Sequence, residues 1–165
     1  MMNFAYLLLG SNLGDRFALL QRAKEEISSG IGNITRESSV YESEPWGFQS
    51  EQRFLNLVIR IETKCRPSQL LSEILRIENK LGRFRAVDQG YESRRIDIDI
   101  LFYNDEIISE DKLTIPHPKI PERMFTLLPL SELDRFMIHP GSRKSISDLM
   151  RECPDTLNVY PYRPK

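Results

Sequence analysis

Residues 93–102 read Ser-Arg-Arg-Ile-Asp-Ile-Asp-Ile-Leu-Phe, and this stretch decides both the fold class and the chemistry of the chain. Polar and β-branched residues alternate in it, which is the period-two pattern of a half-buried strand. The three isoleucines therefore share one face, and Asp97 and Asp99 stand side by side on the other. Neighbouring anions repel each other and aspartate is a poor strand former, so the pair requires a cationic partner.

Two kinds of cation would neutralise Asp97 and Asp99. The first interpretation is a pair of cross-strand salt bridges to arginine or lysine. The second is Mg²⁺, which proteins commonly hold with one or two carboxylates while phosphate and water oxygens complete the octahedral shell. Arg94 and Arg95 lie directly upstream and suit the same phosphates, because guanidinium groups bind phosphate oxygens bidentately. The combination points to phosphoryl or nucleotidyl transfer.

The composition fits an ordinary globular protein and narrows its partners. At 165 residues, 40% of them hydrophobic, the chain is long enough for one domain, spanning 1–165, with a substantial core. Lys plus Arg (23) nearly balances Asp plus Glu (24), so no global basic field favours nucleic acid. The two cysteines lack metal-type spacing, and the apolar run at 4–9 is too short for a signal or a membrane span. We therefore expect a cytoplasmic protein.

The order of the predicted elements indicates the fold class. Apolar runs at 4–9 and 54–61 read as central strands, and residues 34–41 as a more polar strand. One helix follows Asp15, and a second begins at Pro67 and stops at Gly82. With the aspartate strand the order is βαββαβ, the split βαβ arrangement of ferredoxin-like α+β folds, with the helices on one face of the sheet.

The residues beyond 103 are expected to form a C-terminal extension to this core. A turn at 104–105 suggests a short hairpin, and an apolar stretch runs from Arg123 through Leu133. A short helix is expected over 145–151, and the tail from Pro154 carries no motif that can be interpreted.

Three residues interrupt these patterns, and each has a structural and a functional interpretation. Asn56 breaks an apolar strand, so its buried amide either meets a loop backbone or binds the edge of a planar heterocycle. The loop 43–49 holds Trp46, the only tryptophan, and either covers a ligand or packs onto the body. His117 lies between two prolines and either binds phosphate or caps a loop.

The stretch 83–94 has no hydrophobic period and carries Arg83, Arg85 and Arg94. It is either a clamp for a polyphosphate or a solvated basic turn. Glu78, on the helix just before it, reads from its position alone as a solvated residue.

Taken in order, these residues resemble one known family. The motifs are Gly10-Ser11-Asn12, Phe54-Leu55-Asn56, Arg94-Arg95-Ile96-Asp97-Ile98-Asp99, Thr114-Ile115-Pro116-His117 and Arg123-Met124-Phe125. The chain is similar over most of its length to the 6-hydroxymethyl-7,8-dihydropterin pyrophosphokinases of folate biosynthesis. The resemblance implies transfer of pyrophosphate from ATP to the hydroxymethyl oxygen of the pterin, leaving AMP.

The resemblance also implies a role for each site residue. Asp97 and Asp99 would hold two Mg²⁺ ions, and Arg83 and Arg94 would take part in catalysis. ATP contacts are implied for Glu78, Arg85, Ile100, Lys112, Thr114, His117 and Arg123. Pterin contacts are implied for Ser43, Pro45, Trp46, Phe54, Asn56 and Phe125. A monomer acting on small molecules, with no nucleic-acid or membrane partner, is the expectation.

Two other readings of the aspartate strand predict different partners. A palm-type metal-dependent nucleotidyl transferase would also place paired aspartates on a ferredoxin-like sheet, but it would release pyrophosphate and bind nucleic acid. An RNA-binding module would need a basic sheet face, where Asp97 and Asp99 would repel phosphate. The near-neutral charge disfavours both.

Overall fold

The structure, a computed structural model, describes residues 1–82 and 95–165. Its main strands are β1 (Asn3–Ser11), β2 (Gly32–Glu37), β3 (Tyr41–Ser43), β4 (Phe54–Thr63), β5 (Asp97–Tyr103) and β8 (Val159–Pro161). A hairpin is formed by β6 (Ile108–Glu110) and β7 (Leu113–Ile115). The helices are α1 (Arg16–Gly30), α2 (Pro67–Lys80), α3 (Met124–Asp134) and α4 (Ile146–Glu152), with a 3-10 turn, η1 (Ile120–Glu122).

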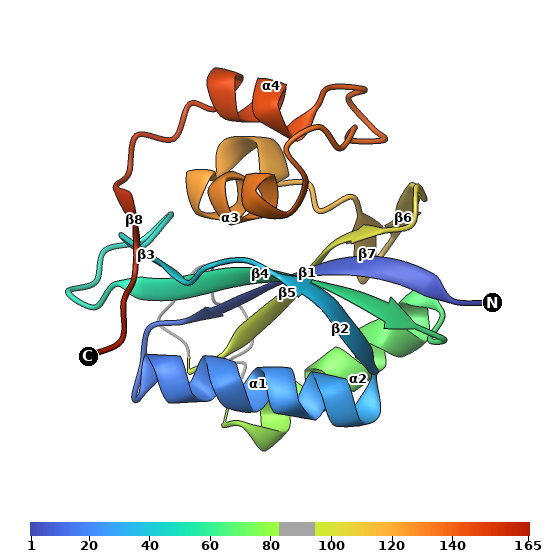
Figure 1. Cartoon of the computed structure of the whole chain (residues 1–165), viewed down its shortest axis with the longest axis horizontal. Coiled ribbons are helices and arrows are strands. Elements are labelled where there is room, and N and C mark those ends of the chain that lie inside the picture. The colour runs from blue at the N-terminus through green and yellow to red at the C-terminus, as the bar shows by residue number, and fades with distance from the viewer. Residues whose placement is uncertain (83–94) are drawn as a thin grey trace.

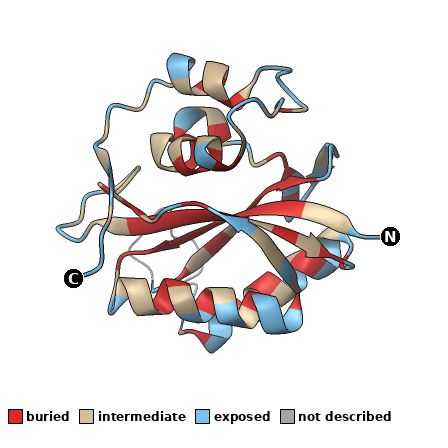
Figure 2. Ribbon diagram, viewed as in Figure 1, coloured by how far each residue is buried: buried red, intermediate tan, exposed pale blue. Residues whose placement is uncertain are grey.

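These elements form three layers (Figure 1). The sheet lies in the middle, α1 and α2 cover one face, which we call the lower face, and α3 covers the opposite, upper face, with α4 packed on the outer side of α3. Figure 2 shows buried residues concentrated in the sheet and on the helix surfaces that face it. The predicted placement of the first two helices on one face is therefore confirmed, and the C-terminal extension supplies the cover of the other.

The strand order is that of a ferredoxin-like sheet. Within the described residues the order is β5-β1-β4-β3-β8, with β2 also paired to β4, and every pairing is antiparallel. The strand predicted over 34–41 is wrong in one respect, because β2 and β3 are separate strands. Glu37 pairs with Ile59 of β4, and Tyr41 pairs with Asn56. Four positions on one side are thus matched by only three on β4. This extra residue is a bulge, which breaks the pairing.

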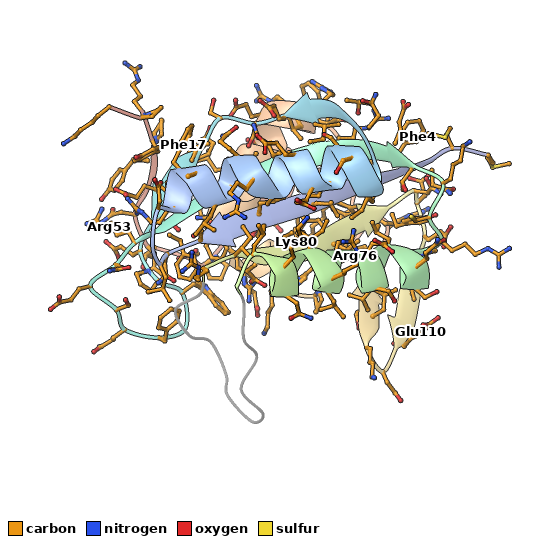
Figure 3. The ribbon with its side chains drawn as sticks, turned by 90° about the horizontal axis from the view of Figure 1, so that it is seen from below. Phe4, Phe17, Arg53, Arg76, Lys80 and Glu110 are labelled. Atoms are coloured by element: carbon orange, nitrogen blue, oxygen red, sulfur yellow. The ribbon has the colours of Figure 1, made fainter. Side chains whose placement is uncertain are left out.

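The lower face is a closed hydrophobic core. Alternate residues of the strands, among them Leu7, Leu57 and Ile98, pack there against the apolar stripes of both helices. Asp15 caps α1 by accepting a hydrogen bond from the Ala18 N–H (3.1 Å). In Figure 3, α1 and α2 lie side by side beneath the sheet, and the Lys80 ammonium bridges them by pairing with Glu26 at 2.8 Å.

The upper face is apolar where α3 and α4 lie over it. Tyr6, Leu8 and Val58 contribute to this second core, together with Leu101 and Phe102 of β5. Two consecutive residues of β5 face the same side because Tyr6 pairs with Phe102 while Leu7 pairs with Ile100, which leaves Leu101 as an extra residue. Strict alternation, as read from the sequence, therefore holds only as far as Leu101.

The C-terminal tail, in which the sequence offered no motif, adds the strand β8 to the free edge of β3. Within the part of the chain that the structure describes, no helix is long and apolar enough to cross a membrane.

Candidate active site

A pocket of about 280 Å³ opens on the upper face where α3 and α4 do not cover the sheet. Its floor comes from β1, β4 and β5, and its walls come from the end of β3, the loop after it, the 117–123 segment and the start of α3. The pocket is lined by Leu8, Gly10, Ser43, Glu44, Trp46, Phe48, Phe54, Asn56, Asp97, Asp99, His117, Pro118, Lys119, Arg123 and Phe125. Residues from six separate parts of the sequence thus meet in one cavity.

The two aspartates face this pocket, as the alternation predicts. Asp97 and Asp99 are half-buried, while Ile98 and Ile100 between and beyond them are buried in the lower core. Asp97 lies opposite Gly10 on β1, and Asp99 lies opposite Leu8. Neither of these facing residues carries a charge, so the register does not support cross-strand salt bridges with β1.

His117 stands beside Asp99 as a neutral imidazole. Its Nε2 lies 4.0 Å from the Asp99 Oδ2. Burial, reinforced by the positive charge of Arg123, lowers the pKa of His117 to about 4. Its Nδ1 accepts a hydrogen bond from the Lys119 N–H at 3.1 Å, so the proton of the neutral ring sits on Nε2. The ring is thus a neutral donor aimed at the aspartates and not half of an ion pair.

Asn56 is held by Ser43 on the neighbouring strand. The Asn56 side chain is 2% exposed, and its Nδ2 donates to the Ser43 Oγ at 2.7 Å. The loop-backbone partner considered for this amide is therefore wrong, because the partner is a side chain of β3. A Cβ at Gly10 would lie 3.0 Å from the Asn56 Oδ1, so a glycine leaves room for the amide oxygen. The arrangement fixes a hydrogen-bonding amide in the pocket wall.

Aromatic rings line both sides of the cavity. Phe54 comes from β4 and Phe125 from α3, and the Phe48 ring meets the edge of Phe54 at 6.0 Å between centroids. The Arg123 guanidinium lies over Trp46 at 4.5 Å and near Phe125 at 5.6 Å. Trp46 therefore packs onto the body of the protein while it also lines the pocket. Pro45 precedes it in the same loop but does not line the cavity.

α3, which carries Phe125, is tied to the sheet by Glu132. This carboxylate accepts hydrogen bonds from the Ser39 N–H (2.9 Å), the Ser39 hydroxyl (2.7 Å) and the Tyr41 hydroxyl (2.7 Å). Burial and the neighbouring carboxylate raise the pKa of Tyr41 to about 12, so its hydroxyl stays protonated and continues to donate. The C-terminal end of α3 is thus fixed to the segment 39–41, about two turns from Phe125 at the start of the helix.

Four of the predicted ATP contacts lie outside the pocket. Glu78 is buried, at 1% exposure, and its Oε2 accepts a hydrogen bond from the Ile98 N–H at 2.9 Å. The reading of Glu78 as a solvated residue is therefore wrong. Ile100 belongs to the lower core, Thr114 is an exposed residue of β7, and Lys112 lies in the turn before it. Arg83, Arg85 and Arg94 fall outside the described residues.

Sequence reasoning missed several residues of the cavity. Glu44, Phe48 and Lys119 line it; the first two lie within the loop 43–49 that had been singled out, and Lys119 follows the Pro-His motif by two residues. Nearness in sequence to those motifs was the available signal. Gly10 falls outside the strand predicted over 4–9, whereas it is the last but one residue of β1 and faces Asp97 across the strands.

Fold and pocket together define a ferredoxin-like α+β protein with an aromatic cavity floored by paired carboxylates. The family model of 7,8-dihydro-6-hydroxymethylpterin-pyrophosphokinase matches residues 6–135 of the chain. The chain belongs to this family, which confirms the predicted class of enzyme, a pterin pyrophosphokinase of folate synthesis.

Curated relatives agree over most of the chain. The 2-amino-4-hydroxy-6-hydroxymethyldihydropteridine pyrophosphokinase of Aquifex aeolicus is 40% identical over 147 residues, which cover 89% of this chain and 90% of the relative. The protein of the same name from Bacillus subtilis is 42% identical over 134 residues, 81% of this chain and 79% of the relative.

Among solved structures, the Plasmodium falciparum HPPK-DHPS with pterin and p-hydroxybenzoate superposes with a TM-score of 0.74 at 19% identity. The match covers 92% of this chain but only 42% of that chain, and at this identity it supports the fold alone.

Proposed function

We propose that this pocket binds 6-hydroxymethyl-7,8-dihydropterin and that the protein transfers pyrophosphate to it from ATP, giving AMP and the pterin pyrophosphate. The observation that carries the proposal is one cavity that joins two aromatic rings, a fixed buried amide and two carboxylates. A flat polar heterocycle and a polyphosphate are the ligands that such a lining fits together.

The pterin ring would lie between Phe54 and Phe125. Stacking between two aromatic side chains suits a flat ring, and the Asn56 amide would bind its hydrogen-bonding edge. One Nδ2–H of Asn56 donates to Ser43 and orients the amide, so its oxygen would accept from the ligand and its second N–H would donate to it. Ser43 and Trp46, which line the cavity, would complete this half of the site, and Pro45 would contribute only through the backbone of the loop that joins them.

The residues present fit Mg²⁺ only in partnership with a phosphate ligand. Among the described residues, no group of three or more histidine, cysteine, aspartate or glutamate side chains gathers to hold a metal ion. Asp97 and Asp99 offer two carboxylates, and Mg²⁺ commonly takes its remaining oxygens from substrate phosphates and water. We assign these two residues to two Mg²⁺ ions. Bound Mg²⁺ would neutralise phosphate charge and orient the attacking hydroxyl.

The nucleotide would extend from the aspartates along the side of β5 that faces away from β1. Glu78 holds this side at Ile98, and β7, which carries Thr114, contacts β5. Ile100, Lys112 and Thr114 would then lie beside the nucleoside. His117 and Arg123 would meet the phosphates, the first as a neutral N–H donor and the second as a cation. Arg83, Arg85 and Arg94 are assigned to the phosphates as well, from the family resemblance.

In the reaction, the hydroxymethyl oxygen would form a bond to the β-phosphorus while the bond from that phosphorus to the AMP oxygen breaks. The protein would contribute chiefly by positioning the two substrates and by stabilising charge. Stacking would fix the pterin ring. His117 would donate a hydrogen bond to a phosphate oxygen while it remains in its neutral form. Both substrates are small molecules, and we expect a monomer of one domain in the cytoplasm.

The test is product analysis after mixing the protein with ATP, Mg²⁺ and 6-hydroxymethyl-7,8-dihydropterin. We expect AMP and pterin pyrophosphate to form in equal amounts, and chelation of Mg²⁺ to stop the reaction. ADP in place of AMP would indicate transfer of a single phosphate. Free pyrophosphate as product would favour the palm-type nucleotidyl transferase, and no pterin-dependent turnover would overturn the proposal.

A further inference from the structure

The C-terminal tail runs from the upper layer past the edge of the sheet to the lower layer (Figure 1). We call residues 155–162 the strap. They lie beyond the residues 6–135 that the family model matches, so the family assignment gives them no role. Their contacts fall on both walls of the pocket, which distinguishes them from an ordinary chain end.

The first anchor of the strap is Asp155, at the start of α3. The Asp155 Oδ2 accepts a hydrogen bond from the Met124 N–H at 3.0 Å, and its Oδ1 accepts one from the Leu157 N–H at 3.0 Å. α3 has no capping hydrogen bond from the side chain of its own N-cap, Arg123. A carboxylate distant in sequence thus caps the helix at the residue between Arg123 and Phe125, both of which line the pocket.

The second anchor is on the opposite wall. β8 pairs with β3, with Val159 opposite Ser43. Just before β8, Asn158 holds Glu44 twice, because its carbonyl accepts from the Glu44 N–H at 3.3 Å and its Nδ2 donates to the Glu44 Oε1 at 2.9 Å. Ser43 and Glu44 both line the pocket. Only two residues of the strap, 156 and 157, therefore separate the contacts on one wall from those on the other.

The end of the strap is fastened to the lower layer. The Arg53 guanidinium lies 5.5 Å from the Tyr160 ring centroid, and the Tyr162 ring lies 6.1 Å from that of Phe17 on α1. Figure 3 places Arg53 and Phe17 at the same end of the molecule, opposite Phe4. With both ends held, the strap has little freedom to shift relative to the pocket.

We propose that the strap sets the separation of the two pocket walls, with Asp155 and Asn158 as positioning residues for the pterin. The proposal rests on the proposed function, since the ligand between those walls is the pterin. Phe54 on β4 lies opposite Ser43 of β3, so the strap, which holds Ser43 on one side and Met124 on the other, bears on the separation of Phe54 and Phe125. A ring stacked between them loses a quarter to a half of its contact energy when a gap of about 0.5–1 Å opens. The strap pairs with β3 and binds the start of α3, whereas the aspartates lie on β5 at the other side of the sheet order, so the strap should act on the pterin and leave the chemical step alone.

The experiment compares Asp155→Ala and Asn158→Ala with the parent protein by steady-state kinetics and by equilibrium pterin titration followed through Trp46 fluorescence. We expect the KM and Kd for the pterin to rise about fivefold to tenfold, the loss expected for a cap or a local clamp. The kcat and the KM for ATP should stay within about twofold. Asp155→Asn should restore most of the affinity, because its amide oxygen can still accept from Met124.

Two matched controls lie in the same part of the chain. Glu152→Gln alters an exposed carboxylate of α4 that pairs with Lys144, and removal of residues 163–165 deletes exposed residues after β8. Both should leave the pterin KM unchanged. Pterin affinity within twofold of the parent in both Asp155→Ala and Asn158→Ala would overturn the role of the strap. Absence of pterin binding by the parent protein would instead overturn the proposed function. If Asp155→Ala does not fold, Asn158→Ala, which alters an exposed residue, decides the question.

Discussion

The two faces of one sheet are built from the same strands but completed in different ways. On the lower face, alternate residues such as Leu57 and Ile98 are sealed by α1 and α2, the helices that directly follow β1 and β4. On the upper face, the residues adjacent in sequence to these, such as Asn56 and Asp97, line the pocket. The rest of the upper face is covered by α3, and α4 and the strap complete this side of the molecule; all three follow β5 in the chain.

The difference separates stability from function. The lower face needs only apolar volume, and its loss should lower the free energy of unfolding. Around the pocket, the upper face carries polar groups and aromatic rings held in fixed positions. Removing one of these side chains should lower ligand binding or turnover instead of stability. Substitutions at adjacent positions of one strand should therefore give opposite outcomes.

The largest effect is expected for Asp97→Asn on the upper face. Removing one charge where phosphate and Mg²⁺ are proposed to meet should lower kcat by about a thousandfold or more, the scale seen when one electrostatic group is removed from an active site. The fold should be retained, because Asp97 is only half-buried. Steady-state turnover with ATP and the pterin, together with thermal unfolding, measures both.

Asp105→Asn is the matched control for this substitution. It makes the same change in charge on an exposed turn that follows the same strand, and it should leave kcat unaltered. Unchanged turnover in Asp97→Asn would end the assignment of β5 to the metal and phosphates.

The next effect is expected for Leu57→Ala on the lower face, next to Asn56. Leu57 is 1% exposed, and truncation of a buried leucine to alanine lowers the free energy of unfolding by about 2–5 kcal/mol. Urea denaturation measures the change, and kcat and KM at a temperature where the variant is folded should remain near those of the parent. A large loss of kcat in the folded variant would show that the two faces are not independent.

The sequence allowed the lower face to be predicted almost completely. Each strand and helix of the βαββαβ core was found, because Leu and Ile at period two or at helical spacing leave few alternatives. The break between β2 and β3 and the extra Leu101 in β5 escaped prediction, since bulges depend on how two strands pair and not on either strand alone.

The upper face could be predicted only in part. The faces of Asp97 and Asp99 followed from alternation, and the family resemblance added Phe54, Asn56 and Phe125, which line the same pocket. The strap had no periodic or motif signal, since its contacts are hydrogen bonds and a short strand pairing with residues more than thirty positions away, such as Met124 and Glu44. Glu78 was misread for a similar reason, because a carboxylate that binds a distant backbone N–H resembles a surface residue in sequence.

A smaller effect is expected from pH, acting on His117 at the pocket. The pKa of His117 is about 4 in the folded protein and near 6.5 in an unfolded chain. Between these values the unfolded chain binds a proton that the folded protein does not, so stability falls as the pH falls from 6.5 towards 4. This histidine alone should lower the free energy of unfolding by about 2 kcal/mol between pH 7 and pH 4.5.

Urea denaturation of the parent and of His117→Gln at both pH values measures this contribution. The variant should lose less stability on acidification than the parent. The other histidine, His139, also has a pKa lowered by burial, so a residual dependence of the same sign is expected. Equal losses in parent and variant would contradict the neutral state of His117.

The smallest effect is expected for two serines that bind β4 in equivalent ways. The Ser43 Oγ accepts from the Asn56 side chain at 2.7 Å, in the open part of the upper face, whereas the Ser38 Oγ accepts from the Val58 N–H at 2.9 Å, where the face is closed. Ser43→Ala releases the amide that would meet the pterin, so the pterin KM should rise about fivefold, which corresponds to about 1 kcal/mol, the usual net value of one hydrogen bond.

Ser38→Ala is the control that sharpens the comparison. It leaves a buried backbone N–H without its side-chain acceptor, so it should lower the free energy of unfolding by about 1–3 kcal/mol while the pterin KM stays unchanged. Kinetics and urea denaturation of both variants test the pair together. If Ser38→Ala raised the pterin KM as much as Ser43→Ala does, the upper face would respond as one unit, and the division of β4 into a structural end and a binding end would be wrong.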